Sequence, residues 1–169
     1  MQDFVHLHVH TQYSLLDGQA SVARLVDKAM QNGMKGIAVT DHGNMFGIKE
    51  FTNYVNKKNS GPKGEIKDLK KRLVGIEAGS IECEDKEAEV AACKAKIVEA
   101  ENKLFKPIIG CEMYVARRTM DLKEGKQDQS GYHLIVLAKN ETGYHNLIKL
   151  VSHAWTRGYY MRPRTDRSE

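Results

Sequence analysis

The sequence contains little cysteine, little proline and no long apolar stretch, and each shortage excludes a class of protein. Its three cysteines form no C-x-x-C pair, so neither a disulfide framework nor a zinc ribbon is expected. No window approaches the uninterrupted apolar run of a membrane span. The N-terminus also lacks the basic and then apolar order of a secretory signal peptide. We therefore expect a protein of the cytoplasm with no membrane partner.

The charge of the chain is also modest. Its 26 basic and 22 acidic residues give a net charge of +4, which permits contact with nucleic acid but does not by itself argue for it. The 169 residues are enough for one domain with a real hydrophobic core, and the length alone does not require two.

What the sequence does contain is a group of histidines at alternate positions near its start: His6, His8 and His10. Alternate side chains of a strand share one face, so these imidazoles are spaced to reach one metal ion or two neighbouring ones. A half-exposed strand that merely carries histidines is the alternative, but Asp17 follows as a possible oxygen ligand. The stretch therefore predicts a strand that holds metal. We leave out His6, which lies furthest from the C-terminal end of that strand.

Strands and helices are expected to alternate downstream. Ser21 can cap a helix that Gly33 ends, a continuous apolar run at 36–40 fits a strand buried on both faces, and a second helix is expected from Phe46 to about Val55. Such alternation is typical of a parallel sheet or barrel.

The C-terminal third continues this pattern. Strands are expected at 107–116 and 132–138, with a polar loop over 117–130 between them. Thr142 can cap a last helix that Gly158 ends. The arginine-rich tail after that helix is expected to form no closing element.

The middle of the chain interrupts the alternation. Apolar residues recur at intervals of three and four from Ile66 to Ile76 and again from Val90 to Leu104, with a turn favoured at Ala78-Gly-Ser80. We therefore expect an antiparallel helical hairpin at 57–104, inserted into the β/α domain and able to bind a partner. A solvated linker is the alternative, which the regularity of both stripes disfavours.

Histidines and carboxylates fall at the ends of the expected strands or just beyond them, where the active sites of β/α folds converge. They are too many for one tetrahedral zinc and suit two or more divalent ions such as Zn, Mn or Fe. Such ions activate water and clamp the oxygens of a phosphoester, so hydrolysis of a phosphate ester is the expected reaction class. The candidates are His8, His10, Asp17, Asp41, His42, Glu112 and His133.

Several of these residues allow a structural explanation. His133 could be a buried, hydrogen-bonded histidine, and Asp41 could orient a histidine instead of binding metal. Glu112 lies among apolar neighbours, where a carboxylate needs a partner or a metal. Cys111 is expected to be a small core residue.

A set of motifs in fixed order resembles the polymerase and histidinol phosphatase (PHP) domain family, and more narrowly the version at the N-terminus of bacterial DNA polymerase III alpha subunits. The resemblance covers most of the chain except the expected hairpin. The motifs are His8-Val-His10-Thr11, Tyr13-Ser-Leu-Leu-Asp-Gly18, Thr40-Asp-His-Gly-Asn44, Pro107-Ile-Ile-Gly-x-Glu112, His133-Leu-x-x-Leu-Ala138, Gly143-Tyr-x-Asn-Leu147 and Arg157-Gly-Tyr-Tyr-x-x-Pro-Arg164.

The resemblance implies a distorted seven-stranded β/α barrel that holds a multinuclear metal cluster, with no catalytic residue beyond the metal ligands. The ligands it implies are His8, His10, Asp17, His42, Glu112 and His133. The family's further ligands, a cysteine and a later aspartate and histidine, have no counterpart here. At 169 residues the chain is also shorter than the roughly 250 typical of such barrels. We therefore expect residues 1–169 to be the N-terminal part of a PHP domain, inactive when isolated.

Three functions are open at this point. In the first, the metal cluster hydrolyses phosphodiesters at a DNA 3′ end as a proofreading exonuclease, within a longer DNA-directed polymerase that uses Mg and works with DNA, a sliding clamp and an exonuclease subunit. In the second, the domain binds metal only structurally and docks a separate exonuclease subunit. In the third, the chain is a stand-alone phosphatase of the histidinol-phosphate type.

Overall fold

The computed structural model describes residues 4–129 and 131–169. The chain forms two compact units. The first combines the residues up to Tyr54 with Pro107–Glu169, and the second is Val55–Lys106. Within the described ranges, no helix has both the length and the apolar composition needed to cross a membrane.

A four-stranded mixed sheet organises the first unit. Its strands are β1 (Gly36–Val39), β2 (Lys106–Ala116), β3 (Gly131–Leu137) and β4 (Arg164–Thr165). The order is β1-β2-β3, with β4 also on β2; β3 runs antiparallel to β2, whereas β4 is parallel to it. The prediction of an α/β fold with parallel strand pairing is therefore confirmed at this level.

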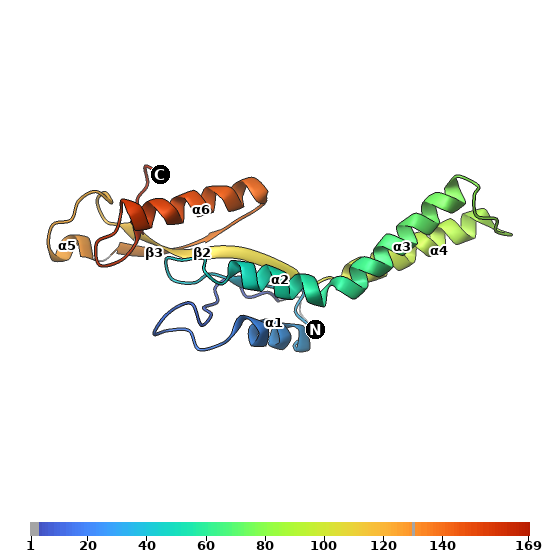
Figure 1. Ribbon diagram of the computed structural model, residues 1–169, viewed down its shortest axis with the longest axis horizontal. Coiled ribbons are helices and arrows are strands. Elements are labelled where there is room, and N and C mark those ends of the chain that lie inside the picture. Colours follow the sequence, from blue (N-terminus) through green and yellow to red (C-terminus); the bar gives the residue numbers. More distant parts are fainter. Residues whose placement is uncertain (1–3, 130) are drawn as a thin grey trace. The chain divides into compact units, whose positions relative to one another are not determined.

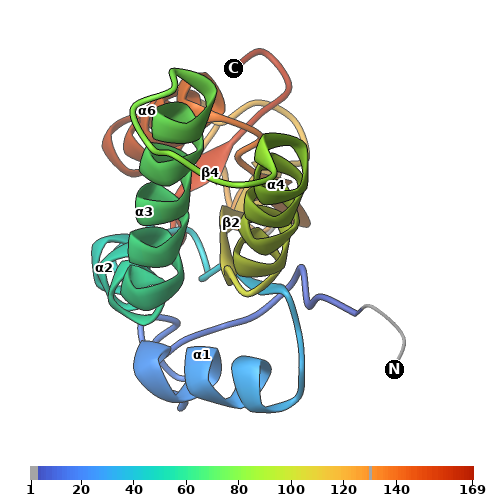
Figure 2. The ribbon, with the colours of Figure 1, turned by 90° about the vertical axis from the view of Figure 1, so that its right-hand side faces the viewer.

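Two helices cover opposite sides of this sheet (Figures 1 and 2). On one side, α1 (Val22–Gln31) packs against β1. Its cap is the predicted one, because the Ser21 side chain accepts a hydrogen bond from the Arg24 backbone N–H. The chain leaves the helix through Gly33, whose φ of +76° favours glycine.

On the other side, α6 (Glu141–Thr156) packs against the centre of the sheet. The predicted cap, Thr142, is wrong: Asn140 precedes the helix in an extended conformation, and its side chain accepts from the Gly143 N–H. Asn is the stronger N-cap residue, which explains the earlier start. The core between helix and sheet is Cys111, Met113, Leu147 and Ala154, with Met45, Val136, Leu150 and Val151 around it.

The histidine-rich start of the chain is not the regular strand that alternation predicts. It is extended beside β1, where Ala38 N donates to His6 O and Thr40 N donates to Val9 O. Three steps on the histidine side therefore match two steps on β1, as in a bulge, with a bend at Leu7. The extra residue breaks the alternation between His6 and the histidines that follow it.

The remaining helices of the chain are α2 (Ile48–Lys58), α3 (Ser60–Glu77), α4 (Lys86–Asn102) and α5 (Lys126–Gln129). The first begins two residues after the predicted Phe46. The last is a single turn within the region predicted as the loop 117–130, of which Ser130 lies outside the described residues.

The tail does form a closing element, contrary to prediction. Arg164 in β4 is only 1% exposed, and its guanidinium donates to four backbone carbonyls. A two-residue strand held by one buried cation leaves no periodic pattern in the sequence. The accepting carbonyls belong to Gly158, Asp128, Met120 and Leu122, at 2.8–3.1 Å.

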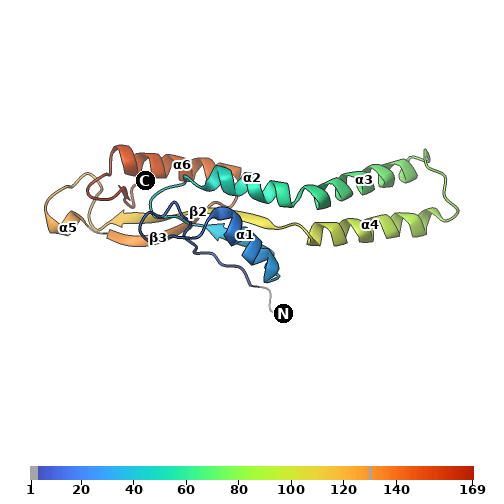
Figure 3. The ribbon, with the colours of Figure 1, turned by 60° about the horizontal axis from the view of Figure 1, so that its bottom comes forward.

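The second unit is a pair of helices, α3 and α4, that run side by side (Figures 2 and 3). Their facing stripes include the buried Ile76, Cys93, Ile97 and Ala100. At the base of the pair, Asn59 makes a two-way bond with the backbone of Phe105: its Nδ2 donates to the carbonyl at 2.8 Å, and its Oδ1 accepts from the N–H at 2.9 Å. This buried asparagine ties the two ends of the hairpin together.

We predict that Arg164→Ala lowers the free energy of unfolding by about 3 kcal/mol or more, because it leaves buried carbonyls without donors. Urea denaturation followed by circular dichroism measures the change. Arg167→Ala is the control, since Arg167 is exposed and its loss should cost about 0.5 kcal/mol or less. Equal losses for the two variants would contradict the role of Arg164.

We also predict that Asn59→Ala destabilises the hairpin by about 2 kcal/mol, because the Phe105 backbone loses both partners. Hydrogen exchange at the amides of α3 and α4 should then be faster. The exposed Asn56, whose side chain only accepts from Lys63, provides the matched control Asn56→Ala. Unchanged exchange in Asn59→Ala would show that helix packing alone holds the base.

Candidate metal centre

The centre is built around one carboxylate, Glu112, which is 3% exposed in the middle of β2. Its neighbours Cys111 and Met113 point into the core under α6. Because side chains alternate along a strand, Glu112 projects from the opposite face of the sheet. A parallel bridge to His42 places this point of β2 beside the chain just after β1.

Each carboxylate oxygen of Glu112 faces two imidazoles. Oε2 lies 2.5 Å from His8 Nε2 and 2.6 Å from His10 Nε2. Oε1 makes a short hydrogen bond with Nδ1 of His133 and lies 3.5 Å from Nδ1 of His42. Four histidines from three separate parts of the chain therefore meet at one glutamate.

These contacts decide the charge of the glutamate. Burial alone raises the pKa of Glu112, but hydrogen bonds to His8, His133 and His10 outweigh it and hold the pKa at about 2. The carboxylate is therefore ionised at neutral pH although water hardly reaches it. A buried anion of this kind requires positive charge close by.

For His42, in contrast to Glu112, burial outweighs the charged neighbours and favours the uncharged form. Burial lowers its pKa, against the opposing effect of Glu112, so the ring is neutral at pH 7 and can offer a lone pair. Its Nε2 lies 2.9 Å from Oδ2 of Asp17, whose side chain is 60% exposed. Its buried Nδ1 has no hydrogen-bond partner among the residues that the structure describes.

The donor atoms form two adjacent groups of the kind that holds divalent metal in proteins. Two groups of three residues have ligand atoms within 4.8 Å of one another, and they share Glu112. In the first group, the Nε2 atoms of His8 and His10 lie 3.1 Å apart and both face the same carboxylate oxygen. The unpartnered Nδ1 of His42 belongs to the second group. Imidazole nitrogen and carboxylate oxygen together suit Zn, Mn or Fe. The groups are His8, His10 and Glu112, and His42, Glu112 and His133.

Asp41 does something other than either sequence-based alternative. It is 1% exposed and holds the loop after the histidines: Oδ1 accepts from Thr11 N at 2.6 Å and from Ser14 Oγ at 2.7 Å. Oδ2 accepts from Thr11 Oγ1 at 2.8 Å. Asp41 thus holds the loop that leads to Asp17 through hydrogen bonds. Among the described residues, it neither orients a histidine ring nor belongs to a ligand group.

The turn after His42 is fixed from several directions. Gly43, at φ +60°, has its carbonyl bonded by the Trp155 indole of α6 at 2.7 Å, and a Cβ here would strike Pro163. Asn44 donates to the carbonyls of Tyr13 and His42 at 3.1 and 3.0 Å. Sequence reasoning saw the Gly-Asn pair as part of a motif but missed the tryptophan, which lies 112 residues away along the chain.

Sequence reasoning also missed Tyr114. It shares the face of Glu112 and pairs across the sheet with His133. Its ring is nearly parallel to that of His42, at 10° with centroids 5.8 Å apart, and perpendicular to that of His133 at 4.9 Å. Burial raises the pKa of the Tyr114 hydroxyl, while the nearby Arg162 opposes the rise. This tyrosine holds two of the predicted ligand rings in place.

The residues set aside from the sequence lie outside both ligand groups. Burial raises the pKa of the Cys111 thiol to about 12, so it stays protonated and donates to the Asp41 carbonyl. His6 contacts the ring of Phe4. His145 and His153, on α6, pair with Glu141 and Glu169 respectively.

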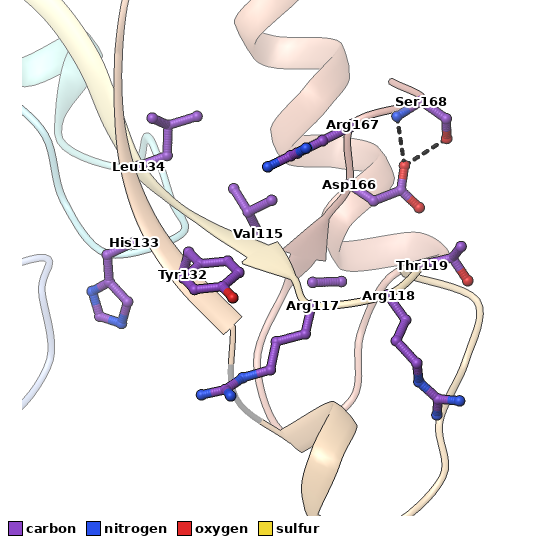
Figure 4. A pocket seen from close by; sticks show the side chains of 11 residues that line it. Val115, Arg117, Arg118, Thr119, Tyr132, His133, Leu134, Asp166, Arg167 and Ser168 are labelled. Carbon is purple, nitrogen blue, oxygen red and sulfur yellow. Dashed lines mark hydrogen bonds between the residues drawn. The ribbon is translucent and has the colours of Figure 1, made fainter.

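A cavity of about 650 Å³ beside β3 includes only His133 of this centre in its lining. Figure 4 shows the His133 ring on the opposite side of β3 from Tyr132 and Arg117. Arg167 and Asp166 line the same far side. The cavity is therefore not the space in front of the histidines, and we do not assign it to the centre.

Comparison with known proteins agrees with this geometry. The PHP domain family model matches residues 6–98 and 83–169. DNA polymerase III subunit alpha from Treponema pallidum is 40% identical over 96% of this chain, and the one from Borreliella burgdorferi is 38% identical over 98%. The chain spans about a tenth of these relatives, 10% and 11% of their lengths.

The family match includes the histidine segment, the turn after β1 and the strand of Glu112, which together form the centre. The chain therefore belongs to the PHP-domain family, and it is similar to the PHP region of DNA polymerase III alpha subunits.

Proposed function

We propose that the centre binds two or more divalent ions and hydrolyses phosphodiester bonds. The observation that carries this proposal is the sharing of Glu112 between two ligand groups. Bound there, Zn, Mn or Fe would lower the pKa of a water and stabilise charge on phosphate oxygens. The proposed ligands are His8, His10, Asp17, His42, Glu112 and His133, and no further residue acts as a general acid or base.

The chain's own residues set up this chemistry before metal arrives. Glu112 supplies a fixed negative charge, since its pKa lies far below neutrality. His42 is neutral, so it need not lose a proton to bind. Asp41 keeps the loop after His10 in position, and the bond from Trp155 to Gly43 fixes the turn that follows His42; neither residue belongs to a ligand group.

The substrate that we propose is a DNA 3′ end, with the PHP centre acting as a proofreading 3′–5′ exonuclease within a cytoplasmic DNA polymerase III alpha subunit. Support comes from the names of the relatives, which are replicative polymerase subunits. The polymerase reaction, with its Mg, DNA, sliding clamp and exonuclease-subunit partners, would belong to the whole protein. We further propose that the four-stranded sheet is part of a seven-stranded barrel, with the hairpin at 57–104 as an insertion.

We predict that His10→Ala in the full-length protein lowers metal-dependent release of nucleotides from a DNA 3′ end by about 100-fold or more, because the half-buried His10 contacts Glu112 in the first ligand group. A chelator should do the same to the unmodified protein, and added Zn or Mn should reverse it. His145→Ala is the matched control, since that ring is exposed on α6.

Other outcomes of this experiment point to other functions. If metal binds tightly and His10→Ala lowers only the melting temperature, the centre is a structural scaffold. If the chain hydrolyses phosphomonoesters and leaves DNA ends intact, it is a phosphatase of the histidinol-phosphate type.

Metal content provides a second prediction that needs no assay of activity. Glu112→Ala should lose metal from both positions, because both ligand groups contain it. His133→Ala should lose only part of the bound metal, since His133 belongs to one of the two ligand groups. Elemental analysis after dialysis against Zn or Mn measures both, with Glu141→Ala as an exposed control. Full metal content in Glu112→Ala would exclude a shared ligand.

A further inference from the structure

An arginine with no acidic partner among the described residues lies on the face of the sheet that carries the two ligand groups. The guanidinium carbon of Arg162 is 4.9 Å from the centroid of the Tyr114 ring. That ring in turn contacts both His42 and His133. Arg162 therefore belongs to the same face as the ligand groups, in contrast to Arg117 and Arg167 at the large cavity.

The ion pairing of Arg162 differs from that of Arg118 and Arg157. Arg118 is bonded to Asp128, and Arg157 to Asp121. Arg162 is exposed and forms no ion pair with any described carboxylate. Its guanidinium lies against the Tyr114 ring and hydrogen-bonds to the Tyr114 hydroxyl, which leaves its remaining N–H donors available to an incoming anion.

The backbone presents this side chain in a strained but well-fixed turn. Met161, immediately before it, has a φ of +62°, which is uncommon for a residue other than glycine. Tyr160 N donates to Arg162 O at 3.1 Å across the turn. On the far side, Pro163 is buried against Gly43 and Arg164 is anchored in the core. The left-handed conformation of Met161 costs free energy, and the contacts on both sides of the turn fix the position of the Arg162 backbone.

We propose that Arg162 binds the phosphate group of the phosphodiester substrate, and that Tyr114 is the positioning residue that holds the guanidinium beside the metal ligands. This inference rests on the proposed function of the centre. The planar guanidinium offers parallel donors that match two phosphate oxygens, and binding breaks no internal ion pair. Arg162 supplies an anion site on the protein itself, next to the ions that would contact the other oxygens.

Binding of inorganic phosphate to the Zn-loaded full-length protein, measured by calorimetry, tests the inference directly. Arg162→Ala should weaken phosphate binding by about tenfold or more, because a charge-assisted hydrogen-bond pair is lost. Arg162→Lys keeps the charge but not the planar donors, so its affinity for phosphate should lie between those of the unmodified protein and Arg162→Ala. Arg167→Ala removes an exposed arginine from the other side of β3 and should leave phosphate binding unchanged.

Zinc content and hydrolysis of bis(p-nitrophenyl) phosphate, measured on the same samples, separate the possible failures. If no sample hydrolyses the diester but Arg162→Ala binds phosphate more weakly than the unmodified protein, the anion site is supported and the proposed hydrolase function fails. If Arg162→Ala keeps its zinc and binds phosphate as the unmodified protein does, the anion site is overturned whatever the hydrolysis shows. If Arg162→Ala does not fold, the Arg162→Lys result decides by the same comparison.

Discussion

The structure of the first unit depends on how one buried negative charge is neutralised. Glu112 is ionised at the centre of β2, where water is nearly absent. A carboxylate in such a place is costly unless positive charge and hydrogen bonds surround it. Three segments of the chain therefore have to meet there: the extended start, the turn after β1 and the beginning of β3. The sheet provides the scaffold, and the need to surround Glu112 decides how the loops are arranged on it.

The residues that meet at Glu112 stand out in the sequence because their chemistry is unusual for where they lie, and their role as metal ligands stays a prediction. Histidines on alternate positions, and a glutamate inside an apolar strand, are hard to explain without a partner or a metal. Helix α1 could be predicted for another reason, since Ser21 and Gly33 are local signals that act within a few residues. What was predicted well is therefore either local or chemically distinctive.

What could not be predicted depends on pairs of residues that are far apart in the chain. Nothing near Tyr114 in the sequence indicates that its ring contacts His133, because this contact follows from the register of β2 and β3. Asn59 and Arg164 have ordinary polar neighbours, yet each is buried and bonded to backbone groups elsewhere. The prediction of a regular strand at His6–His10 was wrong because one extra residue opposite β1 breaks the alternation of side chains between the two faces. A periodic pattern cannot reveal such an insertion.

The asparagine at the base of the hairpin has a consequence for the order of folding. Asp41 and Cys111, which meet beside the metal centre, are separated by 70 positions. Asn59 and Phe105 are separated by 46 positions, and the helices α3 and α4 between them pack against each other. Once the hairpin has closed, only about 24 positions of free chain remain to be closed, which lowers the entropic cost by about 1 kcal/mol. A segment that closes on itself in this way therefore leaves a smaller loop to be closed at the centre than a disordered segment of the same length would.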